Sequence, residues 1–154
     1  MRRRFSSYKA YADATINEIF TAQELVKASK LTINTTQTTL FINQNGKFVA
    51  TVLPIQAQFA PISQILTNDF DHDGYIDLLL LGNHADNRLK IGSMDANYGC
   101  LLKGDGKGGF TYIEQSASGL SVTGDVKGAL EIQINKAPYL LIGTSEGPLK
   151  FYKE

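Results

Sequence analysis

Asp69-Phe70-Asp71-His72-Asp73-Gly74-Tyr75-Ile76-Asp77 places four aspartates around one glycine, and the apolar run 78–81 follows directly. Two carboxylates about 4 Å apart repel each other by roughly 4 kcal/mol at an effective dielectric constant of about 20, and a bound cation would remove that repulsion. Calcium suits such a loop because it takes about six to eight oxygen ligands in a tolerant geometry, whereas magnesium requires a tighter octahedron. The stretch therefore predicts a calcium-binding loop that leads into a strand.

The loop also predicts its own ligands. The expected ligands are the carboxylates of Asp69, Asp71, Asp73 and Asp77 and the backbone carbonyl of Tyr75. Gly74 permits the tight turn, because a residue without a Cβ adopts a positive φ at little cost. The alternative is an acidic surface turn that holds no ion.

An EF-hand is excluded by the residues that follow the loop. The opening D-x-D-x-D-G matches an EF-hand, but the twelfth position, which needs a bidentate glutamate, is Leu80. The segment from Ile76 to Gly82 is short, apolar and ended by glycine. This pattern is typical of a buried strand rather than of a helix that leaves the loop.

Composition indicates one ordinary domain with β structure. The 154 residues carry 15 basic and 15 acidic side chains, so no overall charge favours nucleic acid or an anionic membrane. Tyrosine, phenylalanine and glycine are frequent, and tryptophan is absent. Cys100 is the single cysteine, which excludes a disulfide framework within the chain. No apolar run approaches the roughly 20 residues of a membrane span, and no signal peptide is recognisable in this chain.

The pattern changes from helical to β near residue 30. Residues 1–30 are expected to form a helical N-terminal segment, in which Thr21-Ala22-Gln23-Glu24 is a capping box. Residues 31–154 are expected to be β structure. Strands are predicted at 31–34, 38–42 and 47–52, with a turn at Asn45-Gly46 between the last two.

Two stretches of the β region resemble each other at an offset of about 60 residues. The strand–turn–strand pattern of 41–48 recurs at 100–113, and 79–83 recurs at 140–144, which gives repeat units of about 38–99 and 100–154. The aspartate loop is not repeated, since 132–138 contains no carboxylate. Short strands with this period predict two propeller-like antiparallel blades, a partial β-propeller. Two blades cannot close a ring, so the open faces and edges are expected to be covered by more blades of a parent protein, by a homo-oligomer or by the helices.

The other chemical motifs favour no catalytic site. Residues 104–109 are glycine-rich and contain Lys107, but they lie between two predicted strands, which favours a hairpin turn over a phosphate-binding loop. His72 and His84 are expected at the surface. Carbohydrate-active catalysis would need two carboxylates outside the loop, for example Asp95 and Asp125, and nothing in the sequence brings them together. The prediction is that the protein is not an enzyme.

The loop and the Asn45-Gly46-Lys47-Phe48 hairpin resemble the FG-GAP/VCBS repeat of integrin-like β-propellers. The segments 7–12, 94–99 and 102–110 look more narrowly like the C-terminal region of bacterial proteins of the ASPIC/UnbV group, related to cartilage acidic protein. The resemblance implies an extracytoplasmic protein in which calcium loops stabilise the blades. This chain departs from the family pattern in one respect, because its second repeat unit, about 100–154, lacks the calcium ligands.

Two functions remain open at this point. One is a calcium-stabilised extracytoplasmic interaction or adhesion module that binds a protein or a glycan. The alternative is a purely structural C-terminal part of a larger propeller, without a ligand of its own. An exposed aromatic or polar patch on a blade face would favour the first, and burial of both faces and edges would favour the second.

Overall fold

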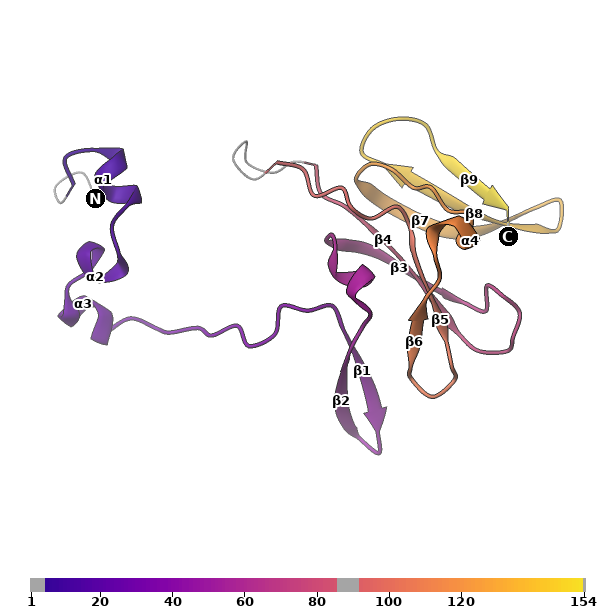
Figure 1. Cartoon of the computed structure of the whole chain (residues 1–154), viewed down its shortest axis with the longest axis horizontal. Helices are drawn as coiled ribbons and strands as arrows, with labels where there is room; N and C mark the ends of the chain where they lie inside the picture. The colour runs from indigo at the N-terminus through magenta and orange to yellow at the C-terminus, as the bar shows by residue number, and fades with distance from the viewer. Residues whose placement is uncertain (1–4, 86–91, 154) are drawn as a thin grey trace. The chain divides into compact units, whose positions relative to one another are not determined.

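The computed structural model describes residues 5–85 and 92–153 (Figure 1). The chain divides into two compact units, Met1–Thr36 and Gln37–Glu154. The first unit is helical and the second contains all the strands of the described chain.

Three short helices form the first unit: α1 (Tyr8–Ala12), α2 (Ile16–Ile19) and α3 (Ala22–Val26). The predicted capping box at the start of α3 is confirmed, because the Thr21 hydroxyl accepts from the Glu24 backbone N–H at 3.3 Å and the Glu24 carboxylate accepts from the Thr21 N–H at 2.8 Å. No residue of the three helices is buried.

The strand expected at 31–34 is not formed. Leu31 and Ile33 are 92% and 80% exposed, and the segment has no strand partner. Alternating apolar residues make a strand only where a neighbouring strand satisfies the backbone and a core covers one face. The prediction for this segment was therefore wrong.

Three antiparallel sheets form the second unit, which confirms a mostly β fold. Their members are β1 (Thr39–Gln44) and β2 (Lys47–Val52); β3 (Ile62–Asn68), β4 (Asp77–Gly82), β5 (Cys100–Gly104) and β6 (Phe110–Tyr112); and β7 (Val126–Ile134), β8 (Ala137–Thr144) and β9 (Lys150–Lys153). A 3-10 helix, η1 (Ile55–Gln58), follows β2, and a short helix, α4 (Gln115–Ser118), follows β6. In each sheet the strands are neighbours in sequence order, and none of the described sheets closes on itself.

The predicted hairpins agree closely with the observed strands. The Asn45-Gly46 turn has φ values of 53° and 84°, the left-handed conformation that a two-residue hairpin turn requires at both positions. Lys47–Val52 has the predicted bounds. The four-stranded sheet β3–β6 combines strands from both of the expected repeat units.

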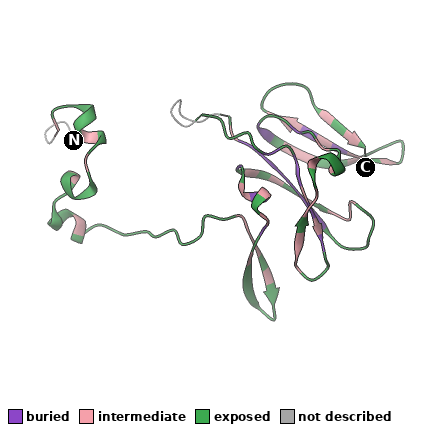
Figure 2. Ribbon diagram, in the orientation of Figure 1, coloured by how far each residue is buried: buried purple, intermediate pink, exposed green. Residues whose placement is uncertain are grey.

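The β3–β6 sheet carries core on both faces. Every residue of β4 is buried, as Figure 2 shows in purple. Leu78 and Leu80 pack on one side with Leu102 and with Leu40 from the β1–β2 sheet. The alternate residues, Leu79 and Leu81, pack on the other side with the β7–β9 sheet. Because successive side chains of a strand point to opposite faces, the apolar run found in the sequence joins the three sheets into one unit.

Strands β3 and β7 lie side by side although they belong to different sheets. Ser63 Oγ donates to the Val126 carbonyl at 2.6 Å, and Asn68 Nδ2 donates to Glu131 at 3.1 Å. Both hydrogen bonds join residues that are 63 positions apart. This spacing is close to the offset of about 60 residues that the sequence predicts for its repeat units.

Candidate metal centre

The aspartate loop connects β3 to β4 at one end of the β3–β6 sheet, hereafter called the central sheet. Its backbone is turned by two residues in the left-handed region, His72 at φ 59° and Gly74 at φ 90°. The Asp69 carboxylate accepts from the backbone N–H groups of Asp73 at 2.9 Å and Gly74 at 2.8 Å. The loop is therefore held in shape by its own carboxylates.

Three of the predicted ligands converge. Carboxylate oxygens of Asp69, Asp71 and Asp77 lie within 4.8 Å of one another. Asp71 is exposed, Asp69 is half-buried, and Asp77 is buried with 2% exposure. Asp69 and Asp71 come from the loop, and Asp77 is the first residue of β4. Carboxylate oxygens are the ligands that calcium prefers.

Asp77 also fastens the loop to the sheet. Its Oδ2 accepts from the Phe70 N–H at 3.0 Å, and its Oδ1 accepts from the Gly104 N–H of β5 at 2.8 Å. Each oxygen of a carboxylate has a second lone pair, so these bonds leave Asp77 able to contact a cation. The sequence predicted Asp77 as a ligand only, and its structural role depends on a strand 27 residues away.

Asp73 is not one of the three converging carboxylates, although its N–H donates to Asp69 and Asp71. Its Oδ1 accepts from the Tyr75 N–H at 2.9 Å, and its Oδ2 lies 2.7 Å from the Lys103 ammonium. The hydrogen bond from Lys103, followed by that from the Tyr75 N–H, lowers the pKa of Asp73 below its ordinary value.

Lys103 is a member of the site that the sequence reading missed. Its ammonium contacts the carboxylates of both Asp71 and Asp73, and these contacts raise the lysine pKa above its ordinary value. The ammonium thus supplies part of the positive charge that four neighbouring aspartates require. The sequence around Lys103 does not indicate that this lysine contacts the aspartate loop. Only the pairing of β5 with β4 brings it there.

The turn between β5 and β6 packs against the same loop. A Cβ at Gly104 would lie 2.1 Å from the Ile76 carbonyl oxygen, and one at Gly106 would lie 2.3 Å from the Tyr75 ring. The Asp105 carboxylate accepts from the Lys107 and Gly109 N–H groups at 2.7 Å and 2.8 Å. The glycine-rich segment is therefore the predicted hairpin turn, and its glycines allow close contact with the loop.

The two histidines lie outside the trio. His72 is exposed, and its Nδ1 lies 3.1 Å from the Asp69 carbonyl oxygen. The His84 side chain is 45% exposed, and its Nδ1 lies 3.8 Å from Asp125.

Asp125 belongs to a separate polar cluster that includes Lys127 and the backbone of Ala85. Its side chain is 2% exposed and accepts from the Lys127 ammonium at 2.9 Å and the Ala85 N–H at 3.2 Å. The hydrogen bond from Lys127, and after it that from Ala85, lowers the pKa of Asp125. Asp95, the other example of a carboxylate that carbohydrate-active catalysis would need, is exposed and accepts from Ser93 at 3.3 Å.

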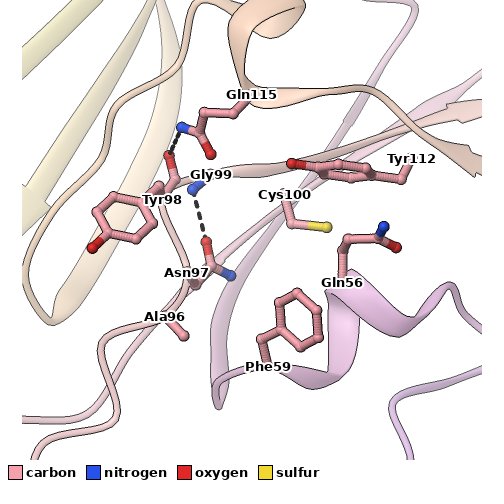
Figure 3. A pocket seen from close by; sticks show the side chains of 9 residues that line it. All are labelled: Gln56, Phe59, Ala96, Asn97, Tyr98, Gly99, Cys100, Tyr112 and Gln115. Carbon is pink, nitrogen blue, oxygen red and sulfur yellow. Dashed lines mark hydrogen bonds between the residues drawn. The ribbon is translucent and has the colours of Figure 1, made fainter.

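A small open pocket of about 130 Å³ lies beside β5 (Figure 3). Its lining is Gln56, Phe59, Ala96, Asn97, Tyr98, Gly99, Cys100, Tyr112 and Gln115. The Cys100 thiol is buried, and burial raises its pKa to about 11. A thiol that stays protonated is a poor nucleophile, so this pKa argues against a reactive Cys100 thiolate.

Comparison with known protein families, curated proteins and solved structures finds no match to this chain. Among the described residues, no helix has the length and apolar character needed to cross a membrane.

Proposed function

We propose that the loop from Asp69 to Asp77 binds calcium and that the second unit is a calcium-stabilised, propeller-like interaction module. The convergence of Asp69, Asp71 and Asp77 within 4.8 Å is the observation that carries the proposal. A calcium ion there would link the loop to the first residue of β4 and so fix the entry of the most buried strand. The expected ligands also include Asp73 and the Tyr75 carbonyl, which would turn toward the ion when it binds.

The Lys103 ammonium bears on the strength of this site. A lysine beside two of the carboxylates opposes a cation by charge repulsion and competes for the same oxygens. Calcium affinity is therefore expected in the range of about 10⁻⁴–10⁻³ M that extracellular modules commonly have. Such a site would be filled where calcium is abundant, so the proposal places the protein in an extracytoplasmic location.

A direct binding experiment tests the proposal. Isothermal titration of the full chain with calcium chloride is expected to show one site, and Asp71→Ala is expected to abolish it. Asp71 is the ligand of choice because it is exposed and its loss leaves the loop bonds of Asp69 and Asp77 in place. The matched control is Asp95→Ala, which removes an exposed aspartate outside the loop. Equal binding by both variants, or no binding by the wild type, would remove the calcium proposal.

The second candidate is a purely structural role, as the C-terminal part of a larger propeller. One observation favours it: the Lys103 ion pairs hold Asp71 and Asp73 without a metal. The outer sheet faces favour the first candidate instead, because they carry exposed apolar side chains such as Phe41 at 60% and Phe151 at 54% exposure. Those faces are apolar rather than polar, so a protein is the better proposed partner than a glycan. Neither candidate assigns a catalytic role to any residue.

A further inference from the structure

The β1–β2 sheet has one covered face and one open face. Leu40 packs against the core beside the β3–β6 sheet. The opposite face presents Phe41, Phe48 and Val52, which are 60%, 70% and 50% exposed. Residues paired across a hairpin lie on the same face, so the pairs Phe41–Ala50 and Asn43–Phe48 define this open face.

The β7–β9 sheet is open on the side away from the core. Leu140 and Ile142 are buried against the β3–β6 sheet. Side chains on the opposite face of the sheet form a row across its three strands. The row consists of Leu130, Leu141 and Phe151, which are paired in direct register. Leu130 and Phe151 are 49% and 54% exposed, although leucine and phenylalanine in such a row are typical of a sheet interface.

A comparison of the β7–β9 sheet with the β3–β6 sheet indicates what kind of surface would cover the Leu130–Leu141–Phe151 row. A β-bulge lies at Ile62/Gln64 in β3 and at Val126/Gly128 in β7, so the two strands correspond at an offset of 64 residues. This correspondence matches the row Leu130–Leu141–Phe151 to the row Leu66–Leu79–Leu101. The latter row lies in the core between the β3–β6 and β7–β9 sheets. The free row is thus the counterpart of one that a following sheet covers.

A second correspondence, at an offset of 61–62 residues, applies at the other end. Phe110 pairs with Gly104 in the β5–β6 hairpin as Phe48 pairs with Asn43 in β1–β2. Phe110 and Leu102 pack in the core beside Leu40, on the face that the preceding sheet covers. Phe48 and Phe41 occupy the equivalent face of β1–β2 and are open.

We propose that these two faces bind each other between copies of this chain, head to tail, with the Leu130–Leu141–Phe151 row of one copy against the Phe41 and Phe48 face of the next. This contact would continue the stacking order of the two sheet interfaces within each chain. Charge does not oppose it: in the described strands Lys153 is the one charged residue on the β7–β9 face, and the β1–β2 face has none. The proposal does not depend on calcium binding.

A complementation experiment tests both the association and its direction. The full chain is expected to form species larger than a monomer in analytical ultracentrifugation, since head-to-tail contacts build rings or filaments. Phe48→Asp blocks one face and Phe151→Asp blocks the other, so each variant alone is expected to be a monomer. An equimolar mixture is expected to form a dimer, because one intact face remains on each partner. Leu31→Asp is the matched control, because Leu31 is exposed but belongs to neither of the two sheet faces. This variant should associate like the wild type.

Other outcomes would overturn the proposal. A monomeric wild type would assign the faces to another polypeptide. Self-association of Phe48→Asp alone, with a monomeric Phe151→Asp, would indicate a symmetric contact of the β7–β9 face with itself. Circular dichroism checks that each variant is folded, and Phe41→Asp and Leu130→Asp probe the same two faces if either first variant is not.

Discussion

Among single residues, Asp71 and Asp77 differ most in their surroundings, although both are predicted ligands. Asp77 is buried and accepts two backbone N–H groups, whereas Asp71 is exposed and is paired with Lys103. Asp77→Ala would leave two N–H groups of a buried region without an acceptor. At about 1–3 kcal/mol for each unsatisfied group, this variant is expected to lose about 2–6 kcal/mol of stability with or without calcium.

Chemical denaturation in EDTA measures that loss. Asp71→Ala is the comparison and is expected to lose less than about 1 kcal/mol there, because exposed ion pairs contribute little. Equal losses for the two variants would contradict the structural role assigned to Asp77.

Lys103 gives a second prediction at this scale. Lys103→Met removes the ammonium beside Asp71 and Asp73, so the variant is expected to bind calcium more tightly than the wild type. Calorimetric titration measures the change in Kd. Lys107→Met is the control, because Lys107 lies in the neighbouring turn and contacts none of the loop carboxylates in the described hydrogen bonds. Weaker calcium binding by Lys103→Met would show that the lysine supports the site instead of competing with the ion.

Asp125 gives a prediction about pH. Its pKa is lower in the folded protein than in the unfolded chain, so its contribution to stability is complete above the unfolded value of about 3.9 and is lost as the pH falls below it. The melting temperature of the wild type should therefore fall more steeply than that of Asp125→Asn between neutral pH and about pH 3. Equal falls in melting temperature for the two proteins over this pH range would contradict the stabilising role of the Asp125 carboxylate.

At the scale of elements, the contact between the β5–β6 turn and the aspartate loop requires a glycine at 104. Gly104→Ala would place a methyl group 2.1 Å from the Ile76 carbonyl oxygen, which is backbone and cannot move aside cheaply. The expected loss exceeds about 2 kcal/mol. Gly128→Ala in β7 is the control, since nothing lies within 4 Å of its added Cβ, and it should cost little or stabilise slightly. Thermal melts of both variants compare the two costs directly.

Local patterns determine which elements could be predicted. The Asn45-Gly46 turn, the run into β4 and the capping box at Thr21 are short-range signals, and the structure shows all three. The segment 31–34 has the residues of a strand but no partner, and pairing is a tertiary property that composition does not encode. Within the site, the aspartates were visible in the sequence. Lys103 and the Gly104 N–H were not, because only the pairing of β4 with β5 brings them to the loop.

Over the whole molecule, both apolar core clusters lie in the unit from Gln37 to Glu154. A chain that begins at Gln37 is therefore expected to fold and to keep the melting temperature of the full protein. The three N-terminal helices bury none of their residues, so their removal costs no core. A clear fall in the melting temperature of the shortened chain, measured by calorimetry, would contradict this expectation.

The sheet order also differs from the division into two repeat units that the sequence predicts. Sequence similarity marks equivalent strands, but it does not say which of them share a sheet. The β3–β6 sheet joins strands from both expected units, and the two-residue turn at Asn135-Lys136 replaces the aspartate loop between β7 and β8. The calcium site is therefore expected once in the described chain, at the end of the central sheet.

The most direct measurement is the melting temperature of the full chain in calcium and in EDTA, for the wild type and for Asp71→Ala. At 10 mM calcium and a Kd of about 10⁻⁴–10⁻³ M, binding should stabilise the wild type by about 1.4–2.7 kcal/mol, a shift of several degrees. Asp71→Ala should melt at the same temperature in both solutions. Two results would contradict the calcium site: a wild type whose melting temperature does not change with calcium, or an Asp71→Ala variant whose melting temperature rises with calcium as much as that of the wild type.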